Sequence, residues 1–220
     1  PTMIAVIIGV AFVASTLMLM DSIKAATLRT QAAAVGDATA VVTAKEPSKP
    51  ISPTTTDKIA TVPGVISVEQ TRNVLLQRTD NGQAALVNGH LIPTHPHLVK
   101  GRAPATLDEV AVNQSTADNN AAIGSKITVN DPSRDGAKSI TLTVVGVLDP
   151  NSRTTTTPTS PEVYLSAASL ASISGHRGAN TVYVNSDRPA AQIVREVSKV
   201  VGTTATVRTA DDERAHQADQ

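Results

Sequence analysis

Three histidines close together in the sequence are the first residues whose chemistry stands out. His90, His95 and His97 lie within the stretch GHLIPTHPHLVKG. Imidazole nitrogens bind zinc and copper, and His95 and His97 are close enough to share an ion. However, two prolines stiffen the stretch, and it contains no Asp or Glu that could orient a ligand. Solvated loop histidines are the simpler interpretation, so we expect no metal site and keep these three as the candidates if an ion is bound.

Three adjacent carboxylates near the end of the chain are the next candidates. Asp211, Asp212 and Glu213 have the residue types of an acidic catalytic cluster. Neighbouring side chains diverge around a helix, however, so three such carboxylates do not converge on one substrate atom. We interpret them as solvated charges at the start of a helix.

The sequence has none of the common motifs that would indicate a catalytic site. It contains no Gly-x-x-x-x-Gly-Lys-Ser/Thr loop, and IGSKI at 123–127 lacks the earlier glycine that a phosphate-binding loop needs. A Gly-x-Ser-x-Gly elbow and a His-Glu-x-x-His helix are also absent. We therefore expect no enzyme activity and no cofactor, and any ATP hydrolysis must come from another polypeptide.

Composition narrows the class of protein further. The chain has 220 residues, 40% hydrophobic but only 1% aromatic, with a formal net charge of +0 and no cysteine. Few aromatic rings and no excess of positive charge argue against nucleic-acid binding. Without cysteine the chain has no disulfide scaffold, thiol nucleophile or lipid anchor on a cysteine.

An apolar run at the start of the chain predicts a membrane helix. Residues 3–20 contain nothing more polar than one serine and one threonine. Eighteen residues at 1.5 Å each give roughly 27 Å of helix, close to the ~30 Å hydrocarbon core of a bilayer. The apolar part of a signal peptide is shorter, about 7–15 residues, and a signal sequence is the alternative that stays open. Asp21 would lie at the membrane boundary, whereas Lys24 and Arg29 alone would place this side in the cytoplasm.

The rest of the chain alternates predicted strands and helices. Short β-branched runs between turn residues predict strands at 38–44, 64–77, 83–89, 108–113, 125–130, 137–149, 162–166, 179–185 and 204–209. Helices are expected at 53–62, with Ser52 as N-cap, at 114–123, at 167–174, with Ser166 as N-cap, at 188–201 and in the polar tail.

These elements predict an α+β fold, in which a membrane helix precedes a two-lobed domain outside the membrane. Two mixed β-α-β halves would surround a β-rich inserted lobe. The expected organisation is a membrane helix with its extension over 1–36, a core lobe over 37–100 and 161–210, the inserted lobe over 101–149, a mobile loop over 150–160 and a linker over 211–220.

In its order of segments the chain resembles the extracytoplasmic core domain of MacB/FtsX-type ABC transporter permeases. IIGVAFVASTLMLMDSIKAA is similar to the first membrane helix of that family, and IATVPGVISVEQTRNVLLQ to its helix, Pro-Gly-Val turn and strand. LVKGRAPATLDEVAVNQSTADNNAAIGSKITV resembles the segment that opens the β-rich lobe, and ITLTVVGVL resembles its closing strand. The resemblance covers nearly the whole chain.

The resemblance implies a permease subunit in the cell membrane, with most of this chain extracytoplasmic. The implied partners are a cytoplasmic ABC ATPase subunit, a second permease copy, membrane lipid and an extracytoplasmic partner protein, but no nucleic acid. The implied function is to couple ATP-driven movement of membrane helices to substrate export or extraction outside the membrane. An FtsX-like regulator of a cell-wall hydrolase and a membrane-anchored binding protein without an ATPase are the alternatives.

Function in such a protein would lie in its hinges and in the segments that join it to the membrane. The candidate coupling and hinge residues are therefore Asp21, Lys24, Gly101, Arg102, Asp211, Asp212 and Glu213. We expect the guanidinium of Arg102 to bond backbone carbonyls at the entry to the β-rich lobe.

Overall fold

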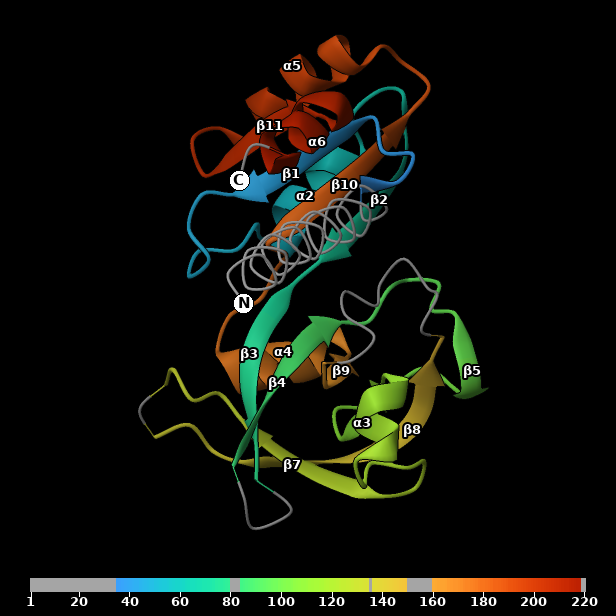
Figure 1. Ribbon diagram of the computed structural model, residues 1–220. Coiled ribbons are helices and arrows are strands. Elements are labelled where there is room, and N and C mark those ends of the chain that lie inside the picture. The colour runs from blue at the N-terminus through green and yellow to red at the C-terminus, as the bar shows by residue number, and fades with distance from the viewer. Residues whose placement is uncertain (1–34, 80–83, 135, 150–159, 219–220) are drawn as a thin grey trace, which may run out of the picture.

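The computed structural model describes residues 35–79, 84–134, 136–149 and 160–218. Two β-sheets, each with its own helices, lie one above the other along the molecule (Figure 1). None of the helices in these ranges is long and apolar enough to cross a membrane. The expected membrane helix over 3–20 and the expected loop, apart from Ser160, lie outside the described residues.

Most of the expected elements are confirmed, with ends that differ by a few residues. The strands are β1 (Ala40–Ala44), β2 (Val65–Thr71), β3 (Asn73–Arg78), β4 (Ala85–Leu91), β5 (Leu98–Gly101), β6 (Glu109–Val112), β7 (Lys126–Asn130), β8 (Ile140–Leu148), β9 (Glu162–Leu165), β10 (Thr181–Ser186) and β11 (Ala205–Thr209). The helices are α2 (Pro53–Ala60), α3 (Gln114–Asp118), α4 (Ala167–Ser174), α5 (Ala190–Val201) and α6 (Ala210–Ala218). Only β5 was not expected among these strands.

Two of the helices begin at the predicted caps. The side chain of Ser52 accepts a hydrogen bond from the backbone N–H of Thr55 at 3.1 Å, which begins α2. Ser166 does the same for Ser169 at 3.1 Å, which begins α4. Each hydroxyl satisfies a donor that has no partner inside the helix, so these starts are determined locally.

The smaller sheet has four antiparallel strands in the order β11-β1-β10-β2. Alternate side chains of β1 point to opposite faces. Ala40 and Val42 pack with the buried residues of α2 and α5, whereas Val41 packs with Val35 and with Ala210 of α6. One face is therefore covered by two helices, and the other carries the two ends of the described chain.

The larger sheet closes into a barrel. Its strand order is β5-β8-β6-β9-β4-β3-β7, and β7 also pairs with β8. Six strands thus form a ring, with β5 added at the edge of β8. Its interior is filled by aliphatic side chains, including those of Leu76, Ile127 and Leu142, and α4 contributes Leu170 and Ile173 to the same core.

Strand pairing differs from the expectation in two respects. The stretch 64–77, expected to be one strand, is broken at Arg72 into β2 of the smaller sheet and β3 of the barrel. In addition, β3 and β4 were expected in the core lobe but pair within the barrel, with β7 and β9. Alternation of apolar residues reveals the faces of a strand but not its neighbours, so the sequence could not assign either strand to its sheet.

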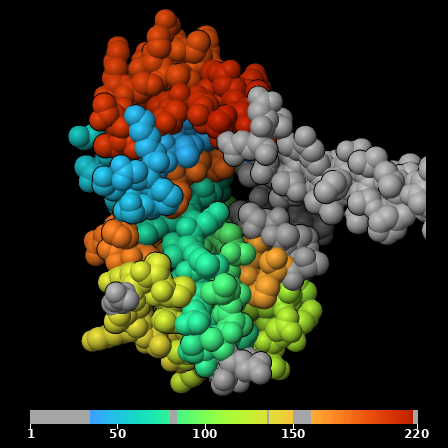
Figure 2. Space-filling view, turned by 60° about the vertical axis from the view of Figure 1, so that its left-hand side comes forward, coloured from blue at the N-terminus to red at the C-terminus, as the bar shows by residue number. Residues whose placement is uncertain are grey.

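The beginning and the end of the described chain lie on the smaller sheet. β1 pairs with β11 from Ala40 opposite Thr209 to Ala44 opposite Ala205. Figures 1 and 2 both show the blue start and the red end of the chain on this lobe, away from most of the barrel. Both ends of the described chain are therefore part of the lobe built on the smaller sheet.

Candidate functional site

The described chain crosses between the two sheets at two points, which lie side by side. β2 leads into β3 through Arg72, and α4 leads back to β10 through residues 175–180. The backbone N–H of Asn180 donates to the carbonyl of Thr71 at 2.9 Å, and that of Leu91 donates to the carbonyl of Arg72 at 2.9 Å. We call residues 71–73 and 174–180 the junction.

Arg72 joins the two crossings through its side chain. The residue is only 5% exposed. Its Nη1 donates to the carbonyl of His176 at 2.5 Å, and its Nη2 donates to Oγ of Ser174 at 2.8 Å. Burial lowers the pKa of the Arg72 guanidinium, an effect that the carboxylate of Asp131 opposes. An arginine remains charged at neutral pH, so these are charge-assisted bonds in a buried site.

A second arginine binds the same end of α4. Nη1 of Arg134, from the loop after β7, donates to the carbonyl of Ile173 at 2.8 Å. Gly175 ends the helix at φ 74°, and a β-carbon there would lie 2.8 Å from Cζ of Arg134. The last carbonyls of a helix carry partial negative charge that cations stabilise. Two guanidinium groups therefore hold the helix end from which the chain leaves the barrel.

A cleft of about 220 Å³ lies beside the junction. It is lined by residues 35–38, by the end of β2, by the ends of β3 and β4 with Pro93, and by Tyr164, Tyr183 and Asn185. Both tyrosines of the chain therefore face the same cleft. Burial raises the pKa of the Tyr183 phenol, with a further contribution from the charge of Glu213, so this hydroxyl stays protonated at neutral pH.

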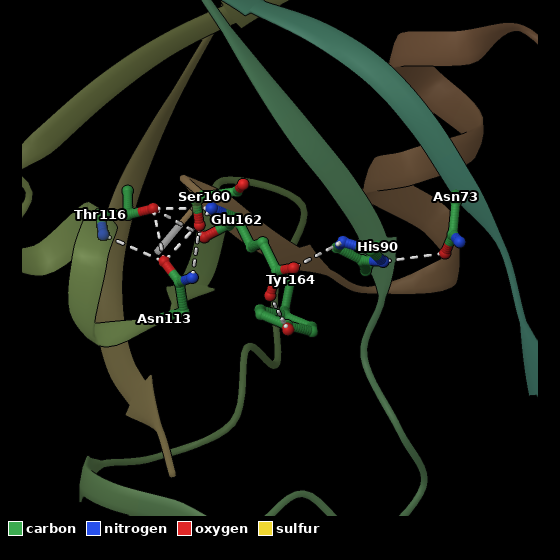
Figure 3. A network of polar contacts seen from close by, with 7 residues as sticks. All are labelled: Asn73, His90, Asn113, Thr116, Ser160, Glu162 and Tyr164. Atoms are coloured by element: carbon green, nitrogen blue, oxygen red, sulfur yellow. Dashed lines mark hydrogen bonds and ion pairs between the residues drawn. The ribbon is translucent and has the colours of Figure 1, made fainter. Parts of the chain in front are cut away.

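A buried polar network connects the start of α3 with His90 and Asn73 (Figure 3), which line this cleft. The backbone N–H of the fully buried Glu162 donates to Oγ1 of Thr116 at 2.8 Å. The hydroxyl of Tyr164 donates to Oε2 of Glu162 at 2.6 Å, and its ring stacks on His90 with centroids 5.1 Å apart. His90 in turn bonds Oδ1 of Asn73 through Nδ1 at 2.8 Å.

The environment of His90 favours its neutral form. The residue is 7% exposed, and burial lowers its pKa, against the opposing effect of the Glu162 carboxylate. Because Nδ1 bonds an amide oxygen, Nδ1 carries the proton and Nε2 is left as an acceptor. Nε2 lies 3.8 Å from Oε1 of Glu162 and has no hydrogen-bond partner among the described residues.

Comparison with known families identifies this two-sheet arrangement. The profile of the MacB-like periplasmic core domain matches residues 2–219. The chain belongs to the MacB-like periplasmic core domain family.

Two solved structures share the fold of this MacB-like domain. The extracellular domain of the noncanonic ABC-type transporter YknZ from Gram-positive bacteria aligns with a TM-score of 0.58 at 12% identity, over 77% of this chain and 99% of that one. The periplasmic region of MacB from Actinobacillus actinomycetemcomitans aligns with a TM-score of 0.55 at 13% identity, over 85% of this chain and 95% of that one. No curated protein sequence matches the chain significantly.

Family membership confirms the coarse expectations from the sequence. The MacB-like domain is an extracytoplasmic domain of an ABC transporter permease. It is not an enzyme, because ATP hydrolysis in such systems belongs to an ATPase subunit, which is thereby an implied partner.

The structure does not bring His90, His95 and His97 together as the ligands of a metal ion. The interpretation as solvated loop histidines is wrong for His90, which is buried within β4 and bonds Asn73 in the polar network. The backbone carbonyl of His97 accepts from Asp149 at 2.9 Å. No group of three or more His, Asp or Glu side chains that could hold a metal ion occurs among the described residues.

Gly101 and Arg102 lie at the end of β5, within the larger sheet of the MacB-like domain. The guanidinium of Arg102 forms two bonds to the carboxylate of Glu109 and one, at 3.2 Å, to the carbonyl of Ala103. Glu109 also accepts from the backbone N–H of Ala105 at 2.8 Å. Arg102 therefore orders the loop before β6, mainly through a carboxylate instead of the expected backbone carbonyls.

The acidic residues of α6 have separate partners. Asp211 pairs with Arg214 at 2.6 Å, and Glu213 pairs with Arg208 of β11 at 2.9 Å. Asp212 accepts from the hydroxyl of Thr209 at 2.7 Å. The carboxylates point to different neighbours, as expected around a helix. The interpretation of all three as solvated charges is wrong for Glu213, which is only 7% exposed because it packs against Arg208 of the neighbouring strand. Asp21 and Lys24 lie outside the described residues.

Sequence reasoning missed the residues that organise the junction and the cleft. An arginine inside an otherwise strand-like stretch, QTRNV, was the available signal for Arg72. A buried charged residue needs a partner, and here the partners come from residues about a hundred positions away. Glu162 and Tyr164 alternate with apolar residues in EVYL, which by itself indicates only a strand.

Proposed function

We propose that this domain transmits ATP-driven movement of membrane helices to the extracytoplasmic side, for substrate export or extraction. The observation that carries the proposal is that both ends of the described chain join the smaller sheet, and that the described residues reach the barrel only through the junction. A displacement of either end would therefore move the smaller sheet first and reach the barrel through the junction.

The two ends are held together by side chains as well as by strand pairing. Nη2 of Arg214 in α6 donates to the carbonyl of Gly36 at 2.8 Å, and its Nη1 donates to Asp211. Val35 packs with Ala210 below the sheet. In this proposal the segment before β1 and helix α6 move as one body.

The junction would then pass this movement to the barrel. A buried, charge-assisted contact resists separation better than a solvated one, because breaking it leaves polar groups unpaired. Arg72 contacts Ser174 at the end of α4 and His176 two residues later, so a rotation of β2 would also displace the helix end. Gly101 and Arg102 remain candidates for setting the position of β5 and the adjoining loop.

The assembly that we propose contains the ATPase subunit, a second permease copy and membrane lipid. Residues 3–20 would form the first membrane helix, with Asp21 and Lys24 at its outer end, and α6 would lead toward the next one. Asp212 and Glu213 would help to hold α6 on β11 through Thr209 and Arg208.

The test uses spin labels in the complete permease assembled with its ATPase. The 220 residues contain no cysteine, so Lys126→Cys on the exposed side of β7 gives one label per copy of this domain. We expect ATP to change the distance between the labels of the two copies. Arg214→Gln should diminish that change while ATP hydrolysis continues, and the matched variant Arg195→Gln on the exposed face of α5 should not.

Two results would contradict the proposal. If the complex shows no ATP-dependent distance change, the domain does not transmit movement. If the distance between the labels changes as much in the Arg214→Gln complex as in the unaltered complex, the movement is not transmitted through α6.

A further inference from the structure

The buried pair of His90 and Glu162 has no role in the proposed transmission of movement, but its geometry is that of a proton-binding site beside the junction. We propose that His90 and Glu162 together take up one proton from the solvent on mild acidification, and that the contact between the junction and the barrel thereby responds to the pH outside the membrane. The proton site does not depend on the proposed function, because it rests on distances and burial within this domain.

Two proton acceptors face each other in this pair. Nε2 of His90 lies 3.8 Å from Oε1 of Glu162, and the two residues are 7% and 0% exposed. Because Nδ1 of the imidazole donates to Oδ1 of Asn73, Nε2 carries a lone pair, and Figure 3 shows this nitrogen turned toward the carboxylate. A lone pair that faces a carboxylate in a buried site is unfavourable, and one proton between the two atoms removes the repulsion.

The added proton would sit on Nε2, because an imidazole, with a pKa of about 6.5, is a stronger base than a carboxylate, with a pKa of about 4.3. Nε2–H can then donate to Oε1 of Glu162 once the two atoms approach from 3.8 Å to the ~2.8 Å of a charge-assisted bond. No other bond of the network has to break. The hydroxyl of Tyr164 still donates to Oε2 of Glu162, and Nδ1 of His90 keeps its proton.

Glu162 is the charged group that acts on His90. Burial lowers the pKa of His90 and the Glu162 carboxylate raises it, with burial the larger effect, so the proton is taken up below pH 6.5. Among the elements packed against β4, helix α4 has no titratable side chain. The remaining titratable groups around β4 are Glu69 of β2, Arg72 of the junction, Arg78 of β3, Tyr164 of β9, Asp37 and Tyr183 in the cleft lining, and His95 and His97 in the following loop.

The pair is connected to the junction through Asn73. Asn73 and His90 are directly opposite each other, at the end of the β3–β4 ladder that meets the junction, and their side chains are bonded. The next backbone bond, from the N–H of Leu91 to the carbonyl of Arg72, lies beside them. An approach of about 1 Å by His90 toward Glu162 must therefore displace Asn73 or stretch its bond. Since His90 also lines the cleft, the proton can reach it from the solvent there.

The experiment is an NMR titration of the purified 220-residue chain in a nonionic detergent, with ¹⁵N and ¹³C labels, starting at neutral pH and ending well below pH 6.5. Couplings between ring protons and ring nitrogens show which nitrogen of each histidine carries a proton. We expect His90 to carry a proton on Nδ1 alone at neutral pH and on both nitrogens at the acid end. The side-chain amide resonance of Asn73 should shift with the same midpoint.

Two substitutions identify the partner of His90. Glu162→Gln removes the carboxylate at nearly constant size and should lower the pKa of His90 by a further pH unit or about that, because no opposite charge then favours the imidazolium. Glu69→Gln removes a carboxylate that lines the same cleft, and as the matched control it should leave the pKa of His90 unchanged.

Three results would overturn the proposal: no proton gained by Nε2 of His90, an Asn73 resonance that does not follow the titration of His90, or equal effects of Glu162→Gln and Glu69→Gln. If Glu162→Gln does not fold, the carboxyl ¹³C resonance of Glu162 in the unaltered chain decides, because a new bond from His90 must shift it with the same midpoint. The titration involves neither ATP nor a second copy, so its failure would leave the test of movement unaffected.

Discussion

Replacing Arg72 by methionine tests the connection between the two sheets most directly. Methionine keeps an unbranched apolar side chain but loses both hydrogen bonds, to the carbonyl of His176 and to Ser174. Bonds to a charged group contribute roughly 1.5–3 kcal/mol each, or about 3–6 kcal/mol for two. Burial disfavours the charge of Arg72, so replacing the guanidinium also removes a desolvation cost and stabilises the fold by on the order of 1–3 kcal/mol. Subtracting these ranges gives a net loss of about 0–5 kcal/mol, with a central value of about 2–3 kcal/mol.

The first assay is thermal unfolding. For a chain of this size each kcal/mol lowers Tm by ~2–4 °C, so Arg72→Met should unfold about 5–10 °C earlier. The matched control is Arg78→Met, because Arg78 is also buried, at 6% exposed, and donates to the carbonyls of Asn119 and Asn120 at 2.9 and 3.2 Å. These contacts lie within the barrel, so the control loses comparable bonds without touching the junction.

Hydrogen exchange distinguishes the two variants. Arg72→Met should speed exchange of the amides that cross the junction, those of Asn180 and Leu91, more than Arg78→Met does. Arg78→Met should act mainly on the segment after α3. Equal acceleration of the junction amides in both variants, or a decrease in Tm below about 2 °C for Arg72→Met, would refute the reasoning.

Three further predictions concern pH and backbone conformation. The bonds from Arg102 and from backbone N–H groups lower the pKa of Glu109 from 4.5 to about 2, so its contribution to stability is complete above pH 4.5 and is lost as the pH falls through 2. The Tm difference between the unaltered chain and Glu109→Gln should therefore shrink over that range, and a constant difference would contradict it. Burial lowers the pKa of His90 from 6.5, so stability should decrease as the pH falls below 6.5, and His90→Gln should flatten that slope in urea unfolding at several pH values. Gly101→Ala should cost more stability in the same assay than Gly124→Ala, because both have positive φ but only at Gly101 would the new β-carbon lie 2.2 Å from a backbone oxygen.

The candidate site could be predicted only in part. The acidic residues of α6 and the stretch from His90 to Arg102 were chosen because their residue types are visible in the sequence. Arg72 and Glu162 were not chosen, since an isolated charge in a strand-like run has no recognisable partner until the chain is folded. Their partners lie on segments far away in sequence, and no spacing rule connects such positions.

Local chemistry determined much of this protein from its sequence alone. Hydroxyl caps, turn residues and apolar periodicity depend on neighbours within a few positions, so α2, α4, α5 and most strands were predictable. The ordered segments also carried the family resemblance. The tertiary structure alone decided that the chain breaks at Arg72, that β3 and β4 complete a barrel, and that both tyrosines line one cleft. The physical reason is that strand pairing and burial of charge are settled by the whole packed core, in which contacting groups are brought together from distant parts of the chain.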